Sequence, residues 1–481
     1  MSSFELLGGL DVQLYHWDTP ATPMNMGNVC LWEGAPLLDS NGRVRIDEIR
    51  RVIAAHLHHV PRYRRKIMQF PGSVLNPILV DDPDFDIAEH IVAETLPPPG
   101  TIEQVKEVFA RIHEGRLDRS RPPWKIVFVD GLEDGRVAMV QKIHHTPFDG
   151  ATTVRIMQQL FDERPDAPAA DPPPWNPQPP PRTSELIAAV LRDQAIAAIK
   201  LHTGPHAPWF RPGGPAELAR TLLALKHFGP APTTSLNGPV GPRRRFDWIH
   251  STIDEARQLR ALVPGAKLND VMLAVVSGGM RDLFLARGED ITRIRPRVFV
   301  PVDVRDDEGE PAPGNQVSAM VEVLPIHELD PVRRLRGITD QMIALKASRQ
   351  AQSMRLLMET SSFTPPTLMA AAGFLAQKAM FMNLTVTNVP GPPHDLYLLG
   401  AKMLELNPML PIGTGLTLNV AVESYAGNLS IGVCCDPDAV PDLDVFTRGL
   451  AAALNELRQR AAAARRRRPV GDPTCETSSK F

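Results

Sequence analysis

Two histidines and an aspartate lie close together in the segment HHTPFDG, which covers His144 to Gly150. A neutral imidazole has an unperturbed pKa of about 6.5, so it can accept a proton at neutral pH. A histidine and an aspartate four residues apart would share one face of a helix, as metal ligands often do. Pro147 stands between them, however, and a proline disfavours helical geometry in the residue before it. We therefore expect His145 at the end of a strand, Asp149 in the following turn and Gly150 at the start of the next helix.

A histidine in that position could act as the base for direct acyl transfer from a thioester to an alcohol. The reaction needs a group that takes the hydroxyl proton and donors that hold the oxyanion. It needs no serine or cysteine nucleophile, and the sequence contains neither a Gly-x-Ser-x-Gly motif nor a phosphate-binding loop. The segment alone leaves two interpretations open: His145 is a general base, or His144 and His145 are structural residues at a strand end.

Composition and charge narrow the class of protein. The chain has 481 residues, 43% of them hydrophobic and 22% charged, which is enough for two domains that each bury a core. Its formal net charge of −3 provides no basic field, so we expect no nucleic-acid partner. The four cysteines are too few and too poorly spaced for a disulfide framework or a zinc site. We expect Cys434 and Cys435 to be buried thiols, no metal site, and a reducing environment.

The sequence predicts neither a signal peptide nor a membrane-spanning helix. Residues 1–9 lack a basic region followed by an apolar run. The longest lipid-like stretch, from Pro366 to Met382, carries Gln377 and Lys378 and is too short and too polar for a span. Arg465 to Arg468 could attract anionic lipid, although a solvated tail is the simpler interpretation. We expect a cytoplasmic protein that contacts a membrane or a lipid droplet only peripherally.

Strand and helix patterns alternate through most of the chain, which predicts a mixed α/β or α+β protein. In the first part we predict helices over 46–58, 103–114 and from Gly150 onward, and strands over 124–129 and 137–143. In the second part we predict helices over 253–262, 270–286 and 333–349, and strands over 297–302, 317–324, 384–389, 416–422 and 428–434.

A run rich in proline separates the two parts. It cannot sustain a helix or a central strand and is expected to be an extended linker. The predicted division is an N-terminal domain over 1–166 that carries HHTPFDG, the linker over 167–183, a C-terminal domain over 184–460, and a disordered basic and polar tail over 461–481.

HHTPFDG resembles the HHxxxDG motif of the wax ester synthase/acyl-CoA:diacylglycerol acyltransferase family, a branch of the CoA-dependent acyltransferase superfamily. Five further segments resemble blocks of that family in the same order: Leu117–Trp124 (LDRSRPPW), Leu236–Arg245 (LNGPVGPRRR), Asn269–Asp270, Phe299–Arg305 with Gly314–Gln316, and Asn388–Pro392 (NVPGP). The resemblance extends from Asp11 to about Leu457, and the order of the blocks makes a chance match implausible. The pattern is similar to the triacylglycerol synthases of actinobacteria and mycobacteria.

The resemblance implies two chloramphenicol-acetyltransferase-like domains with the active site in a tunnel between them. It implies that His145 is the general base, which acyl-CoA reaches from one side and the alcohol from the other, and that His144 supports it. Asp149 would be a structural clamp that pairs with an arginine, for which Arg305 is the candidate. The implied substrates are a long-chain acyl-CoA and diacylglycerol or a fatty alcohol, which give triacylglycerol or wax ester. No cofactor is implied, because acyl-CoA is a substrate.

Other residues of the matching blocks keep more than one interpretation. Asn269 could donate to the oxyanion, where one donor is typically worth about 2.7–4 kcal/mol, or it could cap a helix together with Asp270. Trp124 is more readily a core residue than a substrate contact. Structural parts, in the last three cases at the domain interface, are expected for Gly150, Asn388, Pro390 and Gly391.

Two departures from the family pattern leave the substrate preference open. Position 123 is proline where the family usually has leucine, and position 303 is aspartate, Asp303, where serine is usual. Neither Pro123 nor Asp303 removes the base. The segment Leu368–Met382 could line an acyl channel or meet a lipid surface, and core packing explains it equally well.

Two alternatives to the implied function remain at this level. One is acyl transfer to another hydroxyl, such as that of a glycolipid or a polyketide alcohol. The other is a non-catalytic member of the fold that binds lipid or CoA, against which an intact His145 and Asp149 argue.

Overall fold

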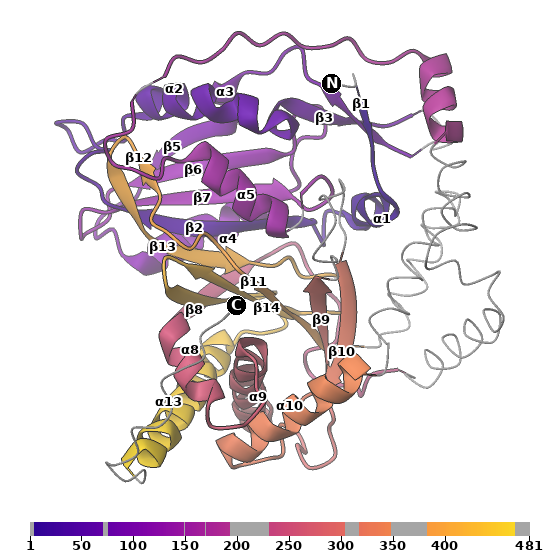
Figure 1. Cartoon of the computed structure of the whole chain (residues 1–481), viewed down its shortest axis with the longest axis vertical. Helices are drawn as coiled ribbons and strands as arrows, with labels where there is room; N and C mark the ends of the chain where they lie inside the picture. The colour runs from indigo at the N-terminus through magenta and orange to yellow at the C-terminus, as the bar shows by residue number, and fades with distance from the viewer. Residues whose placement is uncertain are drawn as a thin grey trace, which may run out of the picture.

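The computed structural model describes residues 4–70, 76–148, 150–168, 170–192, 230–303, 317–347 and 382–466. Over these residues the chain forms two six-stranded sheets with helices and a small three-stranded sheet. In Figure 1 the first large sheet lies above the second. The predicted mixed α/β class is confirmed.

The first large sheet has β7 (Val137–His144) at its centre, in the order β12-β13-β2-β7-β6-β5. β7 pairs antiparallel with β2 (Asn25–Trp32) on one side and with β6 (Trp124–Asp130) on the other. One face packs against α2 (Ile46–His56) and α5 (Gly150–Leu160), and the opposite face packs against α4 (Ile102–Glu114). Short elements complete this half: η1 (Leu57–His59), η2 (Pro61–Arg64), α3 (Ile87–His90) and β5 (Ile91–Thr95).

The small sheet lies at one end of the first half (Figure 1). Its strands run in the order β1 (Phe4–Leu6), β4 (Ile78–Asp81) and β3 (Arg65–Met68). α1 (Gly9–Trp17) packs on it through Val12 and Tyr15. α1 is followed by the loop that leads into β2, so this small sheet fixes the approach of the chain to the first large sheet.

The second large sheet has the order β10-β9-β11-β14-β15-β8, and helices cover one of its faces. α9 is buried at the centre of that cover, because α13 packs closely against it where both helices carry glycine. The strands are β8 (Arg245–Thr252), β9 (Arg297–Asp303), β10 (Val317–Val323), β11 (Leu384–Val389), β14 (Leu418–Tyr425) and β15 (Asn428–Cys435). The helices are α8 (Ile253–Arg260), α9 (Leu268–Ala286), α10 (Pro331–Ala347) and α13 (Leu443–Arg466).

The late part of the chain contributes two strands to the first sheet, β12 (Tyr397–Leu398) and β13 (Ala401–Met409). These strands come between β11 and β14 in sequence, yet β13 pairs with β2 of the first sheet. At the same place the sheets touch, because a Cβ added to Gly432 of β15 would lie 1.9 Å from the carbonyl oxygen of Pro408. The sequence-based division assigns these strands to the C-terminal domain, whereas their pairing places them in the first sheet.

The proline-rich segment has no regular secondary structure over 170–182 and lies along the first half (Figure 1). The indole N–H of Trp175 donates to the carbonyl oxygen of Asp82 (3.0 Å), and the N–H of Gln178 donates to Asp81 Oδ2 (3.0 Å). The Arg64 guanidinium lies 4.9 Å from the centre of the Trp175 ring. A helix over 183–192 follows and buries Leu186 against β4. The linker is therefore fastened to the first half of the molecule.

The C-terminal end differs from the prediction. α13 continues to Arg466, so residues 461–466 are helical and the expected disordered tail over 461–481 is wrong for this part. Alanine has the highest helix propensity, and the run after Arg460 is rich in it, while Ala461 is still buried against the core. Arg467 and Arg468 lie outside the described residues.

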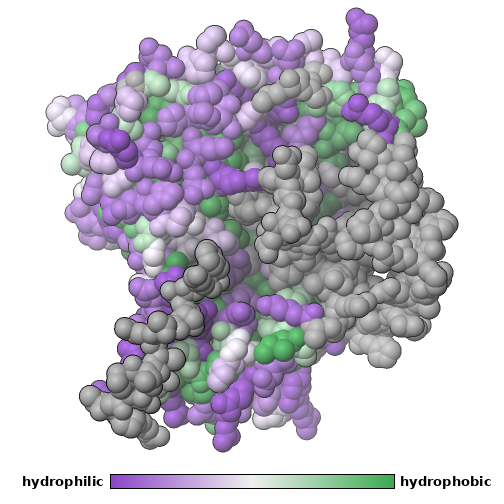
Figure 2. Space-filling view, viewed as in Figure 1, coloured by the Kyte–Doolittle hydropathy of each residue, from purple (hydrophilic) through white to green (hydrophobic). Residues whose placement is uncertain are grey.

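Surface and core follow ordinary rules elsewhere. The face shown in Figure 2 is mainly hydrophilic over the first half. Cys434 and Cys435 are buried free thiols, as predicted, and Cys30 is another. Among the helices that the structure describes, none combines the length and the apolar character that crossing a bilayer requires.

The contact between Gly432 and Pro408 gives the first prediction. Gly432→Ala places a methyl group against a backbone carbonyl that cannot move without disturbing β13, so we expect a loss of about 1–3 kcal/mol in the free energy of unfolding. Urea unfolding followed by circular dichroism measures it. Gly413→Ala is the matched control, because its added Cβ meets no atom within 4 Å among the described residues, its chain neighbours aside. Equal stability of the two variants would contradict the close contact.

Candidate active site

The two histidines lie where the sequence places them, at the end of the central strand. β7 ends at His144, whose N–H donates to the carbonyl oxygen of Pro123 (2.9 Å). His145 is half-buried in the turn, and its N–H donates to the carbonyl oxygen of Met24 (2.8 Å). The residues that flank β7 on both sides therefore hold the backbone of this histidine pair.

His144 faces the interior. It is 3% exposed, and its Nδ1 accepts a hydrogen bond from the N–H of Thr146 (3.1 Å). A neutral imidazole whose Nδ1 accepts must carry its hydrogen on Nε2. That nitrogen lies 3.6 Å from Asp18 Oδ2. The His144 ring thus lies between Asp18 and the N–H of Thr146 on the buried side of the turn. Its expected supporting role remains a prediction.

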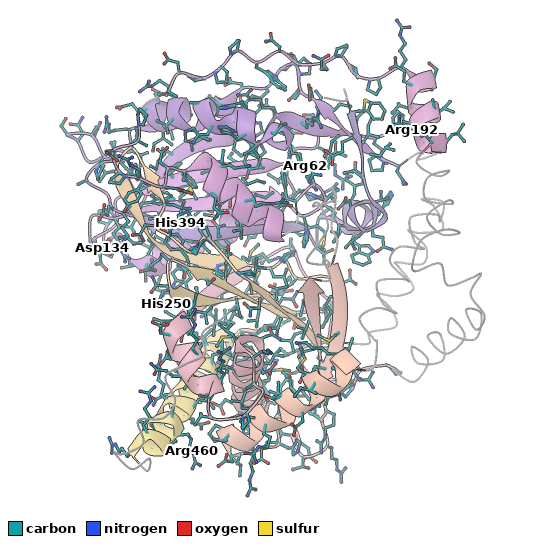
Figure 3. All side chains as sticks on the ribbon, in the orientation of Figure 1. Arg62, Asp134, Arg192, His250, His394 and Arg460 are labelled. Atoms are coloured by element: carbon teal, nitrogen blue, oxygen red, sulfur yellow. The ribbon has the colours of Figure 1, made fainter. Side chains whose placement is uncertain are left out.

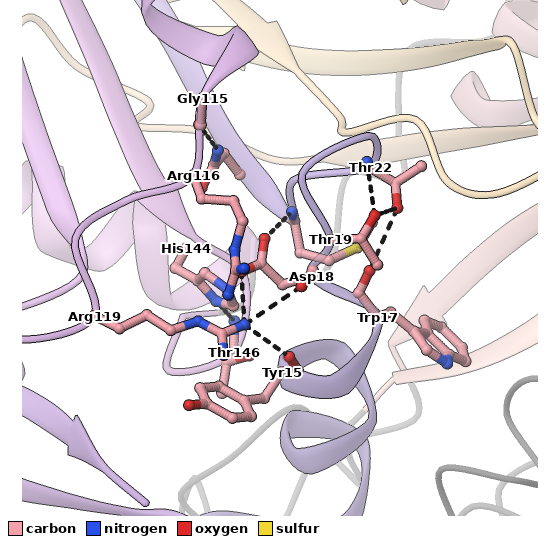
Figure 4. Close-up of polar contacts among 12 residues, drawn as sticks. Tyr15, Trp17, Asp18, Thr19, Thr22, Gly115, Arg116, Arg119, His144 and Thr146 are labelled. Carbon is pink, nitrogen blue, oxygen red and sulfur yellow. Dashed lines mark hydrogen bonds and ion pairs between the residues drawn. The ribbon is translucent and has the colours of Figure 1, made fainter. Parts of the chain in front are cut away.

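Asp18 is the centre of a polar cluster beside the histidines (Figure 4). Its Oδ2 accepts from Arg116 Nε (2.7 Å) and from an Arg119 guanidinium nitrogen (2.8 Å), and its Oδ1 accepts from the N–H of Met24 (3.0 Å). Burial alone would raise the pKa of Asp18, but the nearby His144, Arg119 and the Met24 N–H hold it well below its usual range. Asp18 is therefore a carboxylate at neutral pH.

The end of HHTPFDG meets the NVPGP segment from the other half. A Cβ added to Gly150, the first residue of α5, would lie 3.0 Å from Val389 Cγ2 at the end of β11. Beyond it, Gly391 donates its N–H to Ser424 Oγ (3.1 Å), and its own Cβ would lie 1.9 Å from the Ser424 carbonyl oxygen. Both glycines permit close approach, so the two motifs meet at the junction of the sheets.

The structure describes the other residues of NVPGP but not the two residues of the proposed clamp. Asn388 is half-buried in β11 opposite Val422, and Pro390 is exposed just after the strand. Asp149 and Arg305 lie outside the described residues, as does the segment Leu368–Met382 except for its last residue. The clamp therefore remains a prediction.

Asn269 is not a helix cap. α9 begins at Leu268 with Lys267 as its N-cap, so Asn269 is the second residue of the helix. Asp270 performs the capping from inside the first turn, because its Oδ2 accepts from the N–H of Lys267 (2.9 Å). The cap interpretation is wrong for Asn269, because the helix starts one residue earlier than the residue types indicate.

Trp124 belongs to the core. It is 2% exposed, its indole N–H donates to the Tyr63 carbonyl oxygen (2.7 Å), and its ring stacks against that of His90. The neighbouring departure, Pro123, keeps the carbonyl that His144 needs and lines a hollow beside it with Leu117, Arg119 and Tyr15. Asp303 is the last residue of β9, opposite Val317.

Among the described residues, no three His, Cys, Asp or Glu side chains are grouped closely enough to hold a metal ion. Independently of that, the imidazole of His145 in the turn after β7 is a side chain that can accept a proton.

The comparison with known proteins agrees with this arrangement. A family model for the wax ester synthase/diacylglycerol acyltransferase catalytic domain matches residues 7–272, and the model for the C-terminal domain of the same family matches residues 313–458. The chain belongs to the wax ester synthase/diacylglycerol acyltransferase family.

Relatives within this family span most of the chain. A Mycobacterium tuberculosis protein named probable diacylglycerol O-acyltransferase tgs1 is 31% identical over 84% of this chain and 86% of its own length. Another, tgs2, named in the same way, is 30% identical over 91% of this chain and 95% of its own length. The wax ester synthase/diacylglycerol acyltransferase of Marinobacter aquaeolei has the same fold, with a TM-score of 0.67, 22% identity, and coverage of 95% of this chain and 100% of that one.

More distant structures share the two-sheet fold. The starter condensation domain of rhizomide synthetase, solved with C8-CoA and Leu-SNAC, has a TM-score of 0.56 at 14% identity, covering 97% of this chain and 95% of that chain. The chloramphenicol-acetyltransferase-like architecture implied by the sequence is thus confirmed.

One buried acid at the junction of the sheets was missed at the level of sequence. Glu423 of β14 lies opposite Val389 of β11 and is only 8% exposed. Burial raises the pKa of Glu423 to about 8. Its position on the same side of β14 as Tyr425, which packs in the core of the first half, places it between the sheets. The available signal was an acidic residue directly after the apolar run Val420–Val422 of β14.

The raised pKa gives the second prediction. An acid whose pKa is higher in the folded state binds a proton that the unfolded chain releases, so its contribution to stability falls as pH rises from about 4.5 to about 8. Glu423→Gln is neutral throughout, and we expect it to match the parent near pH 4.5 and to exceed it by roughly 1 kcal/mol or more at pH 8.5. Urea unfolding at both pH values measures the difference. A constant difference between the proteins would contradict the buried neutral acid.

Proposed function

We propose that this chain transfers a long-chain acyl group from acyl-CoA to diacylglycerol, forming triacylglycerol, or to a fatty alcohol, forming wax ester. The observation that carries the proposal is the position of His145 at the end of β7, one turn before Gly150 meets Val389 of the other half. The family and the names of its mycobacterial relatives support the substrate class.

In the proposed reaction His145 is the general base. Its neutral imidazole takes the proton of the acceptor hydroxyl as that oxygen attacks the thioester carbonyl carbon. The tetrahedral intermediate then collapses, the carbon–sulfur bond breaks, and the imidazolium returns the proton to the departing CoA sulfur. We propose Asn269 as a donor to the oxyanion and Asp149 with Arg305 as the structural clamp of the signature segment. Acyl-CoA is a substrate in this scheme, and no cofactor takes part.

Direct attack is favoured over an acyl-enzyme on chemical grounds. A cysteine nucleophile must be a thiolate. Burial raises the pKa of Cys434 to about 11 and that of Cys30 and Cys435 well above the usual value. These thiols are therefore protonated and shielded, and they are unsuited to form a thioester.

The donor and the place of action follow from substrate chemistry. A condensation domain of the same fold has been solved with C8-CoA, which supports an acyl-CoA donor here. Diacylglycerol and fatty alcohols partition into membranes and lipid droplets, so we propose that the protein is cytoplasmic and works at such a surface by peripheral contact. No nucleic-acid partner is proposed.

The third prediction tests the base. Purified protein with palmitoyl-CoA is offered diacylglycerol, hexadecanol or no acceptor, and free thiol and lipid products are followed together. We expect ester formation that depends on the acceptor, and a loss of roughly 100- to 10,000-fold in His145→Ala, which is the range for removal of a general base.

His394→Ala is the matched histidine control for this assay. Its side chain, labelled in Figure 3, is 42% exposed, and its Nε2 lies 3.1 Å from Glu163 Oε1. We expect it to retain activity within about twofold of the parent, as surface substitutions usually do. Undiminished turnover in His145→Ala would refute the assignment of the base, and tight CoA binding without ester in any mixture would favour a binding protein.

A further inference from the structure

The loop between α1 and β2, residues 18–24, contacts the catalytic turn at both of its ends, through Asp18 beside His144 and through Met24, which accepts from the N–H of His145. Thr19 and Thr22 close this loop through their hydroxyl groups (2.8 Å). We propose that Asp18, at its start, is a positioning residue that sets the orientation of His145 without touching substrate. The inference rests on the proposed function, which assigns His145 as the base.

A first path of hydrogen bonds leads from Asp18 to His145 through one residue. Asp18 Oδ1 accepts from the N–H of Met24 (3.0 Å), and the carbonyl oxygen of Met24 accepts from the N–H of His145 (2.8 Å). The peptide unit before Met24 is thus held by the carboxylate, and the peptide unit after Met24 holds His145. A shift of Asp18 is transmitted directly to the backbone of the base.

A second path reaches the residues on either side of His145. Asp18 Oδ2 lies 3.6 Å from Nε2 of His144, and Nδ1 of the same ring accepts from the N–H of Thr146 (3.1 Å). The carboxylate favours the tautomer with hydrogen on Nε2, which leaves Nδ1 free to accept. One buried carboxylate therefore acts on the residue before His145, on the residue after it, and on its own N–H.

The carboxylate can act in this way because it is itself immobile. Its side chain is 1% exposed, and Arg116 and Arg119 donate to the same oxygen (2.7 and 2.8 Å). Arg119 is held in turn by the ring of Tyr15, whose centre lies 4.3 Å from the guanidinium carbon. An asparagine at position 18 would keep the shape but turn either its amide hydrogens or its weaker carbonyl toward these donors. Asp18→Asn therefore tests the charge with little change in volume.

Asp130 provides a matched control. It is also a buried carboxylate, with a side chain 3% exposed, and it accepts from the backbone N–H of Val44 (3.0 Å) and from Arg43 (3.3 Å). It is the last residue of β6, at the opposite end of the strand from Trp124, and Trp124 pairs with Ile143 next to the histidines. Asp130→Asn removes the same kind of interaction without touching the catalytic turn.

The experiment compares Asp18→Asn and Asp130→Asn in steady-state acyl transfer from palmitoyl-CoA and in thermal unfolding. We expect both variants to lose thermal stability, but only Asp18→Asn to lose kcat, by roughly 10- to 100-fold with KM nearly unchanged, because a misplaced base affects the chemical step. Equal effects of the two variants on kcat would overturn the proposal, because Asp18 would then only stabilise the fold.

A second measurement does not depend on catalysis. Hydrogen–deuterium exchange of the peptide over residues 143–148 reports the N–H groups of His145 and Thr146, and we expect it to quicken in Asp18→Asn and not in Asp130→Asn. Unchanged exchange in Asp18→Asn would overturn the positioning role, whereas inactive parent protein would count against the proposed function alone.

Asp18→Glu covers the case in which Asp18→Asn does not fold. It keeps the charge for both arginines but lengthens the side chain by one methylene, so we expect a folded protein with reduced kcat and quicker exchange at the same peptide. Parent-like kcat and exchange in Asp18→Glu would contradict the dependence on distance.

Discussion

The site depends on the central place of β7 in the first sheet. Because β7 is paired on both sides, the strand that precedes the histidines is fixed along its whole length, and its last backbone donors are taken by Pro123 on one side and Met24 on the other. A base at an edge strand would lack one of these supports. The helix that follows then starts against Val389 of the other sheet, so the same strand end that fixes the imidazole also lies at the junction.

The pKa values of two buried acids, Asp18 and Glu423, are shifted in opposite directions. Asp18 is enclosed by two arginines, a histidine and a backbone N–H, so the pKa of its carboxyl is lowered in spite of burial. Glu423 has burial as the cause of its shift, and its pKa is raised to about 8. Charge therefore persists where donors converge on it and is suppressed where they do not. Asp18 beside the histidines is therefore held as a carboxylate, whereas burial favours the protonated form of Glu423 between the sheets.

Local signals predicted correctly that the signature segment runs from a strand end at the histidines to a helix that starts at Gly150, while Asp149 lies outside the described residues. The β-rich run predicts the strand, Pro147 predicts the turn, and the helical spacing after Gly150 predicts the helix. Each of these signals is local, because it depends only on residues within the element itself. The resemblance to a family supplied the fold, which pattern alone leaves at a mixed class. A cap was one of two interpretations of Asn269, because asparagine is a preferred cap residue, but the helix starts after Lys267, whose side chain gives no such signal.

Long-range partners were beyond such signals. In the sequence Asp18 looks like an ordinary residue before a loop. Its proposed role depends on contacts with Arg116, Arg119 and His144, which lie about 100 residues or more away and approach it only in the folded protein. β13 was not predicted, because Pro408 interrupts its pattern and its partner β2 lies near the other end of the chain. Glu423 lies one residue beyond the predicted strand over 416–422, and its burial between the sheets depends on how the two halves pack.

The pairing of β13 with β2 also affects the order in which the first sheet can be completed during synthesis. β2 and β7 leave the ribosome early, while the strand that completes their sheet on the β2 side ends only at Met409. Until then β2 is an unpaired edge, and such edges invite pairing with other chains. The first sheet therefore stays incomplete on the β2 side until residues 401–409 have been synthesised. By pairing with β2, β13 then protects this edge from pairing with other chains.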